Sequence, residues 1–333
     1  MVSKLTEFIN MKSTIFENGE VKIITTEKPS LQNKQGAIVK VYGCGLCGSD
    51  IVKIKNNEHN IKLGHEVVGE IVEINTNTNF KISDIVALGH HIPCFKCEFC
   101  QKGHHSMCRH FKETNIYPCG FSEYIYITEE HLGNTVFKLP ENMDYITASF
   151  MEPLACCIRA IRKAELYNNS NVLISGLGTI GLLTGQAVKA FGHTVNGCDL
   201  LENRITLAKQ LCFDDAFNID KIQNKSYDAV FMTSGSDKAI ETAINAVKDG
   251  GTIVIFSSTP NNMGYCNNEI YYRELKIFGS YSPEPKDLET SLKFLAEKKV
   301  IVNNLSTIYS LDNINMAIED TITNKIMKAY IKL

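Results

Sequence analysis

Four cysteines lie within fifteen residues of one another: Cys94, Cys97, Cys100 and Cys108. Gaps of two, two and seven residues allow four thiolates to surround one tetrahedral Zn²⁺, and four protein ligands leave no position for substrate. The spacing therefore predicts a structural zinc, with four unrelated thiols or a redox cluster as the alternatives. An iron–sulfur cluster usually has proline after its last cysteine, whereas Arg109 follows here. His104 and His105 lie inside the loop, and we expect them to be solvated rather than to replace a thiolate.

A glycine-rich turn is the second chemical signal. It directly follows the apolar run 171–175 and opens a helical stretch that continues to about residue 191. Glycines at such a turn let a pyrophosphate approach the helix N-terminus, where free N–H groups and the helix dipole favour anions. The residues predicted to bind a dinucleotide here are Gly176, Gly178, Thr179, Ile180 and Gly181. A glycine-rich turn that binds no cofactor is the alternative.

An acidic residue at the end of the next predicted strand indicates which dinucleotide is bound. Asp199 lies 18 residues beyond Gly181. A carboxylate at this place can accept both ribose hydroxyls of NAD and would repel the 2′-phosphate of NADP. Arg204, five residues further on, is a further candidate for contact with the cofactor. The pattern therefore predicts NAD in preference to NADP.

A third group of candidate residues is dispersed along the first half of the chain. They are Cys47, Ser49, Asp50, His65, Glu66 and Glu152. One thiolate, one imidazole and one or two carboxylates can form an open, catalytic zinc shell. No local spacing shows that these residues meet. Taken alone, His65 is as readily a buried core histidine and Glu152 a charge at a helix N-terminus.

Length and charge restrict the class of protein that carries these motifs. A chain of 333 residues with 44% apolar and 21% charged residues is long enough for two domains. The net charge of −3 gives no general attraction to nucleic acid or to anionic lipid. No run of 18 apolar residues and no signal peptide is evident, so we expect a soluble, cytoplasmic protein. In that compartment its twelve cysteines would stay reduced.

The elements that must position these residues change character near residue 168. Before it, short strands are predicted at 37–42, 84–88 and 122–127, and at 66–74 as two segments joined by a kink at Gly69. After it, apolar strands alternate with helices. The strands are predicted at 171–175, 193–198, 227–233, 252–257 and 276–280, and the helices at 179–191, 203–211 and 237–248. This alternation predicts a parallel, doubly wound α/β sheet that follows a β-rich domain.

Taken in order, the motifs resemble those of the zinc-dependent medium-chain dehydrogenases, in particular the sorbitol/polyol and threonine dehydrogenase branch. The resemblance extends to the segments 120–124, 249–254, 278–280 and 328–331 and covers nearly the whole chain. It implies a GroES-like catalytic domain at 1–155, completed by 286–333, around a Rossmann NAD-binding domain at 156–285. It also implies a homodimer or homotetramer joined through the sheets of the cofactor domains.

The resemblance assigns roles to the dispersed residues. Cys47, His65 and Glu152 look like ligands of a catalytic zinc, so that two zinc ions are expected per chain. Glu66 looks like the carboxylate that approaches or transiently binds this zinc. Asp50 looks like the residue that orients the ligand imidazole, and Ser49 like the hydroxyl that passes on the substrate proton.

The chain also departs from the family pattern. The segment between Cys47 and His65 is shorter than usual, and Val52 stands where liver-type alcohol dehydrogenases have a second relay histidine. Proton release would then use another route, such as the cofactor ribose and water. Lysines in the shortened segment could meet a phosphorylated or carboxylated substrate, although a solvated face is the simpler interpretation. They are Lys53, Lys55 and Lys62.

The predicted function is hydride transfer between NAD and a secondary alcohol that resembles a polyol or sugar alcohol, giving a ketone or aldehyde. A threonine-type or simple secondary-alcohol dehydrogenase on the same scaffold is the alternative within the class. A non-catalytic protein that binds zinc and a nucleotide is the alternative from another class. No nucleic acid or membrane partner is expected.

Overall fold

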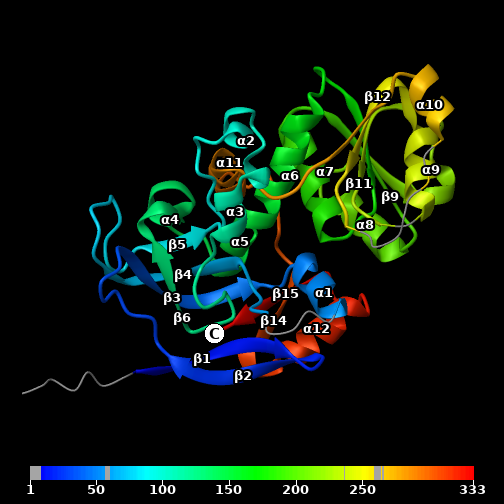
Figure 1. The fold of residues 1–333 in the computed structure, drawn as a ribbon. Coiled ribbons are helices and arrows are strands. Elements are labelled where there is room, and N and C mark those ends of the chain that lie inside the picture. The colour runs from blue at the N-terminus through cyan, green and yellow to red at the C-terminus, as the bar shows by residue number, and fades with distance from the viewer. Residues whose placement is uncertain (1–8, 57–60, 236, 259–263, 265) are drawn as a thin grey trace, which may run out of the picture. The chain divides into compact units, whose positions relative to one another are not determined.

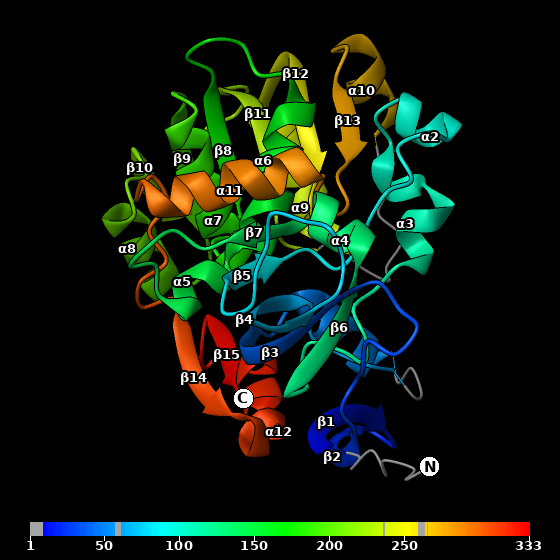
Figure 2. The ribbon, with the colours of Figure 1, turned by 90° about the vertical axis from the view of Figure 1, so that its left-hand side faces the viewer.

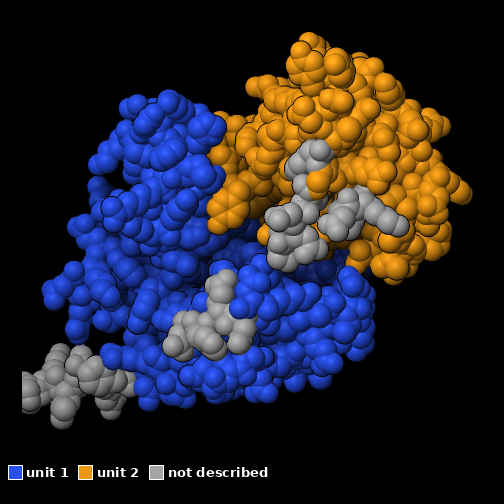
Figure 3. Space-filling view, turned by 45° about the vertical axis from the view of Figure 1, so that its right-hand side comes forward, with its two compact units in different colours: residues 1–152, 303–333 blue, residues 153–302 orange. Residues whose placement is uncertain are grey.

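The computed structural model describes residues 9–56, 61–235, 237–258, 264 and 266–333. These residues form two compact units, coloured separately in Figure 3. Unit 1 comprises residues 1–152 and 303–333, and unit 2 comprises residues 153–302. The sequence analysis places the corresponding domain boundaries after residues 155 and 285. Among the described residues, no helix has both the length and the apolar character needed to cross a membrane.

Unit 1 is built on a mixed sheet of seven strands. Its order is β14-β15-β3-β4-β5-β7, with β6 paired to β3. The strands are β3 (Gly36–Gly45), β4 (Glu66–Ile74), β5 (Ile85–Leu88), β6 (Tyr124–Thr128), β7 (Val136–Lys138), β14 (Ser306–Ser310) and β15 (Lys328–Lys332). A separate hairpin is formed by β1 (Asn10–Glu17) and β2 (Glu20–Glu27). The buried faces of the strands form one core that includes residues from both ends of unit 1, such as Val39 and Ile331.

The C-terminal strand is an internal member of this sheet. β15 lies between β14 and β3, as Figure 2 shows. It runs antiparallel to β3, with Tyr330 opposite Gly45 and Ile331 opposite Cys44. Ile331 is fully buried. This pairing brings Lys328, the first residue of β15, close to the end of β3.

The helices of unit 1 are short. They are α1 (Gly48–Lys55), α2 (Glu98–Gln101), η1 (His105–Met107), α3 (Arg109–Glu113), α4 (Glu129–Asn134), α5 (Tyr145–Ser149), η3 (Leu311–Asn313) and α12 (Ile314–Ile322). Helix α1 connects β3 to the segment before β4. Helices α2 and α3 with η1 carry the four-cysteine loop.

Unit 2 is a six-stranded parallel sheet with the order β10-β9-β8-β11-β12-β13. Its strands are β8 (Asn171–Ser175), β9 (Thr194–Asp199), β10 (Asp215–Asn218), β11 (Tyr227–Met232), β12 (Val247–Ile255) and β13 (Lys276–Gly279). The helices are α6 (Met151–Ala164), whose first two residues belong to unit 1, α7 (Thr179–Ala190), α8 (Glu202–Gln210), η2 (Ile219–Lys221), α9 (Asp237–Ala246), α10 (Asn267–Tyr272) and α11 (Pro285–Ala296). Figure 1 shows this sheet among its helices. The predicted fold class, a β-rich domain with a doubly wound parallel sheet, is confirmed.

Two local features differ from the predictions. The two predicted segments of 66–74 form the single strand β4, and its pairing with β3 is irregular at two places, one of them where Gly69 lies opposite Val41 and Val68 lies opposite Gly43. Helix α9 ends at Ala246, two residues earlier than predicted, and β12 begins at Val247. Val247 is fully buried and pairs with Tyr227 of β11, so tertiary packing ends the helix where its local pattern would continue it.

Gly69 is required by the close approach of β3 rather than by an unusual backbone angle. A Cβ atom at this position would meet the Lys40 carbonyl oxygen and would lie 2.6 Å from Val39 Cγ1. We expect Gly69→Ala to lower the free energy of unfolding by about 1–3 kcal/mol, because the added methyl overpacks a buried strand pair. Denaturant unfolding measures this change.

Gly133→Ala is the matched control, because Gly133 lies in helix α4 with no atom within 4 Å of an added Cβ. Alanine in a helix is more favourable than glycine by about 0.5–1 kcal/mol, so this variant should be slightly stabilised. Equal denaturation midpoints for Gly69→Ala and the unsubstituted protein would contradict the packing argument.

Candidate functional site

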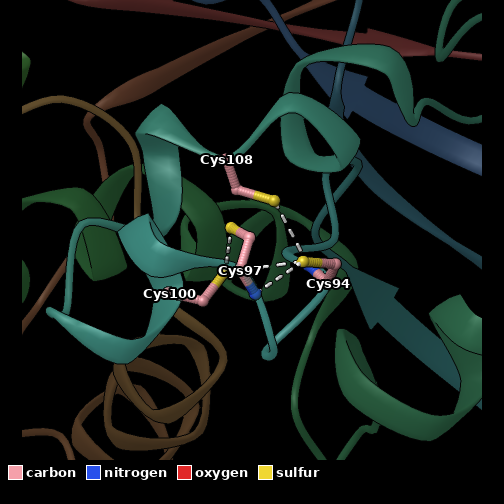
Figure 4. A group of neighbouring side chains, drawn as sticks. All are labelled: Cys94, Cys97, Cys100 and Cys108. Carbon is pink, nitrogen blue, oxygen red and sulfur yellow. Dashed lines mark hydrogen bonds between the residues drawn. The ribbon is translucent and has the colours of Figure 1, made fainter.

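The four-cysteine loop forms one compact cluster of sulfurs. The ligand atoms of Cys94, Cys97, Cys100 and Cys108 all lie within 4.8 Å of one another, and Figure 4 shows the sulfurs pointing toward one place. The Sγ atoms of Cys97 and Cys100 are 3.6 Å apart, and those of Cys94 and Cys100 are 4.0 Å apart. His105 instead packs against the Phe95 ring, with 5.8 Å between centroids.

The backbone of the loop favours the thiolate forms of Cys94 and Cys108, whereas burial raises the pKa of Cys100 to about 12. The Cys97 N–H donates to Cys94 Sγ at 3.4 Å, and the Cys94 N–H donates to Cys108 Sγ at 3.4 Å. Hydrogen bonds from the N–H groups of Lys96 and Cys97 lower the pKa of Cys94 to about 6. Four thiols at these distances, with N–H donors toward their sulfurs, fit a tetrahedral Zn²⁺.

A second group of side chains that could hold a metal ion lies in unit 1. The ligand atoms of Cys47, His65 and Glu66 also lie within 4.8 Å of one another. Cys47 is the N-cap residue of α1, where the chain leaves β3, and Glu66 opens β4 directly after His65. Because β3 and β4 are antiparallel neighbours, the end of one and the start of the other lie side by side. The sheet therefore brings together residues that sequence spacing alone cannot connect.

Asp50 lies beside the imidazole of His65. Its Oδ1 lies 3.6 Å from His65 Nδ1, and its carboxylate accepts hydrogen bonds from the N–H groups of Cys47 (3.2 Å) and Gly64 (3.3 Å). Asp50 is completely buried. Burial raises the pKa of Asp50, but the neighbouring His65 and these hydrogen bonds outweigh it and give a lowered pKa. With Nδ1 directed toward Asp50, the imidazole offers Nε2 to a metal.

Glu66 is buried beside a lysine from the opposite end of the chain. Its Oε2 forms an ion pair with Lys328 Nζ at 2.5 Å. Its Oε1 is buried and has no hydrogen-bond partner among the described residues. A thiol, an imidazole and a carboxylate with an unpartnered oxygen, gathered in one place, are the donors that an open zinc site uses. This group therefore fits a catalytic zinc.

Glu152 and Ser49, the other two residues predicted for this site, do not belong to the group of Cys47, His65 and Glu66. Glu152 is in the first turn of α6 and is only 4% exposed, but it does not belong to the group of three. Burial lowers the pKa of Lys328, but nearby anionic groups outweigh it and the pKa is raised. Glu66 and Cys47 contribute most to this rise, and Glu152 contributes less. Ser49 lies on the exposed face of α1. The sequence-predicted set is thus brought together in part.

Residues of this site that sequence reasoning missed are Lys328 and His90. The sequence analysis includes Lys328 only in the segment 328–331, which resembles the family, and assigns no role to this lysine. The ring of His90 lies 4.6 Å from that of His65 and 3.9 Å from that of His91, centroid to centroid. Burial lowers the pKa of His90 well below its usual value. Two adjacent histidines shortly before the cysteine loop were the available signal.

In unit 2, the glycine-rich turn has the geometry of a phosphate-binding loop. Gly176 has a φ of +99°, and a Cβ at Gly181 would meet the Gly176 carbonyl oxygen, so both positions require glycine. Gly178 is the N-cap residue of the twelve-residue helix α7, and a Cβ there would meet no atom within 4 Å. The loop therefore leaves open space at the N-terminus of α7, where Thr179 and Ile180 begin the helix. This arrangement fits a pyrophosphate.

Asp199 is at the end of β9, beside the glycine-rich turn. Its carboxylate accepts hydrogen bonds from the N–H groups of Leu177 (2.7 Å) and Leu201 (2.9 Å). Arg204 Nη1 lies 3.6 Å from Asp199 Oδ2. The structure thus brings a cation closer to Asp199 than the spacing of five residues suggested. Each carboxylate oxygen still has a lone pair for a ribose hydroxyl.

Comparisons with known proteins agree with both halves of this description. Residues 33–141 match the alcohol dehydrogenase GroES-like domain, and residues 179–297 match the zinc-binding dehydrogenase domain. Sorbitol dehydrogenase from Halalkalibacterium halodurans is 30% identical over 87% of this chain and 90% of that protein. Sorbitol dehydrogenase from Bacillus subtilis is 29% identical over 93% of each chain.

A solved structure shows the same architecture. Galactitol-1-phosphate dehydrogenase from Escherichia coli matches with a TM-score of 0.86 and 26% identity, over 97% of this chain and 100% of that chain. The chain belongs to the zinc-dependent medium-chain dehydrogenases, in their polyol branch. It is therefore an oxidoreductase that acts on a small-molecule alcohol.

Proposed function

We propose that this protein oxidises a secondary alcohol of the polyol or sugar-alcohol type with NAD, using one catalytic and one structural zinc per chain. The observation that supports this most directly is the group of Cys47, His65 and Glu66, whose ligand atoms lie within 4.8 Å of one another. The four-cysteine site cannot bind substrate at its metal, because four protein ligands leave no open position. The group of three ligands leaves a fourth position open for the substrate oxygen.

The proposed ligands of the catalytic zinc are Cys47, His65 and Glu152, with Glu66 as the carboxylate that can approach it. When bound, zinc supplies a Lewis acid that lowers the pKa of the substrate hydroxyl. Asp50 is the positioning residue, because its carboxylate holds His65 Nδ1 and leaves Nε2 for the metal. The proposed ligands of the structural zinc are Cys94, Cys97, Cys100 and Cys108.

Ser49 is the proposed acceptor of the substrate proton. It lies one residue before Asp50 on α1 and is exposed, so its hydroxyl can exchange a proton with water. Val52, on the same helix, offers no further proton acceptor. The proton would therefore leave by water or by the hydroxyls of the cofactor ribose.

The proposed nucleotide contacts are the turn from Gly176 to Gly181 for the pyrophosphate and Asp199 for the adenosine ribose. NAD supplies the hydride acceptor. Asp199 favours NAD because its charge would repel a 2′-phosphate. Arg204 reduces that repulsion, because its positive charge lies beside the same carboxylate. The preference for NAD over NADP therefore depends on the negative charge of Asp199.

Phosphorylated polyols belong among the candidate substrates because of Lys53. It lies on α1 and is half-buried. Its positive charge acts on Asp50, where it lowers the pKa after the larger effects of burial and His65, and it also adds to the effect of burial at His90. No carboxylate of the described residues forms an ion pair with it. A galactitol-phosphate dehydrogenase among the solved relatives agrees with this option.

We also propose a homodimer or homotetramer in the cytoplasm, with no nucleic acid or membrane partner. β13 stands at one end of the parallel sheet, so its outer edge can pair with a second copy. Sedimentation as a monomer would contradict this. All twelve cysteines are free thiols, as a reducing compartment would keep them, and cell fractionation tests the location.

Turnover with and without Cys47 tests the proposed function. We expect NADH formation at 340 nm from NAD and one class among polyols, sugar alcohols, their phosphates, threonine and simple secondary alcohols. Cys47→Ser should lose at least about 100-fold in kcat/KM, because a neutral hydroxyl is a poor zinc ligand. Cys212→Ser, at an exposed free cysteine, is the matched control and should be active.

Selective turnover of threonine would favour the threonine-type alternative, and turnover of phosphate esters that falls in Lys53→Gln but not in Lys55→Gln would identify the phosphorylated class. Full activity of Cys47→Ser would exclude the zinc mechanism. Absence of turnover across the panel, with zinc and NAD bound, would favour the non-catalytic alternative or a substrate outside this class.

Asp199 determines the expected cofactor preference. We expect Asp199→Ala to raise the KM for NAD by about 10–100-fold, because hydrogen bonds to a charged group contribute about 1.5–3 kcal/mol. The KM for NADP should rise less or fall, since Arg204 is then free to meet the 2′-phosphate. Steady-state kinetics with both cofactors measures this.

Asp215→Ala is the control for this measurement. Asp215 lies on the neighbouring strand β10, with a side chain 58% exposed and an ion pair to Lys209 at 3.6 Å. Its removal should change neither KM. Equal effects of Asp199→Ala on NAD and NADP would contradict the proposed role of this carboxylate.

A further inference from the structure

Thr233 directly follows β11, beside the glycine-rich turn that follows the neighbouring strand β8. Its hydroxyl donates a hydrogen bond to the Gly176 carbonyl oxygen at 2.7 Å, and a longer contact of 3.2 Å joins it to the Ser175 carbonyl oxygen. The shorter distance is typical of a well-formed O–H···O bond, so Gly176 is the main acceptor. The sequence analysis places Thr233 at the end of a predicted strand and assigns no role to its hydroxyl.

The carbonyl that Thr233 holds belongs to the peptide between Gly176 and Leu177. The N–H of the same peptide donates to Asp199 Oδ2 at 2.7 Å. In a trans peptide the C=O and the N–H point in opposite directions, so this planar group is held from two sides. Strand β8, which leads into the turn, lies between β11 and β9 in the sheet. The peptide therefore connects a hydroxyl after β11 to a carboxylate at the end of β9.

Gly176 does not fix the direction of this peptide by itself. Its φ is +99°, and a Cβ would lie 3.0 Å from Thr233 Oγ1 and 3.1 Å from Ser234 Cβ, so the position requires glycine. Glycine lacks the Cβ that restricts backbone rotation in other residues. A peptide turned the other way would point its carbonyl oxygen toward the Asp199 carboxylate and would lose the hydrogen bond to it. A hydrogen bond to the carbonyl opposes this rotation.

The direction of the peptide determines how the Asp199 carboxylate is presented. The Leu177 N–H holds Oδ2, and the Leu201 N–H holds Oδ1 at 2.9 Å. Two fixed donors keep the carboxylate in one orientation before any ligand arrives. A group that is already held in its bound orientation loses less entropy on binding, which raises affinity.

We propose that Thr233 is a positioning residue for the dinucleotide: its hydroxyl fixes the direction of the peptide between Gly176 and Leu177, and this peptide holds Asp199 in the orientation that receives the adenosine ribose. This inference rests on the proposed NAD site. Because Thr233 acts through the peptide, it needs no contact of its own with the cofactor. The role requires a hydroxyl donor, so serine can replace threonine, whereas valine cannot.

A merely structural role would leave cofactor affinity unchanged. If the hydroxyl only tied the end of β11 to the end of β8, its loss would lower the free energy of unfolding, and the folded protein would bind NAD as before. If the hydroxyl acts on Asp199, its loss weakens binding, and the effect disappears once Asp199 has been removed. The dependence on Asp199 therefore separates the two roles.

Calorimetric titration of the full chain with NAD and with ADP-ribose measures the effect. We expect Thr233→Val to raise the Kd for NAD by about 3–10-fold, the change that corresponds to one hydrogen bond. ADP-ribose lacks the nicotinamide and should lose affinity by the same factor, because the effect lies at the adenosine ribose. Thr233→Ser should bind both ligands like the unsubstituted protein. Thr233→Ala should show the same loss as valine and replaces it if the added methyl prevents folding.

Two further variants serve as controls. Thr290→Val removes a hydroxyl that donates to the Lys286 carbonyl oxygen at 2.8 Å within α11, away from the glycine-rich turn, and should leave the Kd unchanged. The double variant Asp199→Ala, Thr233→Val should match Asp199→Ala alone within about 2-fold, because residues that act through one hydrogen-bond network are not additive.

Each outcome decides one question. Unchanged affinity in Thr233→Val and Thr233→Ala, or an equal loss with and without Asp199, would overturn the role of Thr233 while leaving the NAD site intact. A loss for NAD that is absent for ADP-ribose would also overturn it, because the effect would then lie at the nicotinamide. An unsubstituted protein that binds neither ligand would instead overturn the proposed NAD site on which this inference rests.

Discussion

The ion pair between Glu66 and Lys328 joins the two ends of unit 1 at the centre of its candidate active site. It depends on β15 being inserted beside β3, since only that pairing carries a C-terminal lysine to the start of β4. A buried ion pair of this kind adds little net stability, because desolvating both charges offsets their attraction, whereas losing one partner is costly. The main consequence of this pair is the position of the Glu66 carboxylate, one of whose oxygens it holds.

The two cysteine-containing groups differ in whether the sheet is needed to assemble them. The four-cysteine loop draws its ligands from fifteen consecutive residues, and its N–H donors hold the sulfurs without help from the sheet. The second group needs the sheet: Cys47 comes from the end of β3, His65 and Glu66 from the start of β4, and Asp50 from α1 behind them. Structural zinc sites are closed by four protein ligands, whereas catalytic zinc sites keep one position open. Here the closed type fits the local group and the open type fits the group that the sheet assembles.

The difference between local and assembled sites also explains what could be predicted from the sequence. The Cys94–Cys108 spacing and the glycine turn at 176–181 are complete within short segments, so their geometry followed from the sequence. The meeting of Cys47, His65 and Glu66 depends on strand register, and the contact of Lys328 with Glu66 spans almost the whole chain; no local pattern encodes either. Tertiary packing likewise ended α9 at Ala246, because Val247 enters the buried sheet.

X-ray absorption at the zinc edge tests the central claim, that one closed and one open zinc site occur in each chain. With two zinc ions bound, the closed site contributes four sulfurs and the open site one, so the spectrum should average about 2.5 sulfurs per zinc, with nitrogen and oxygen completing the shells. A single zinc per chain with four sulfurs would contradict the assignment of Cys47, His65 and Glu66 to a metal.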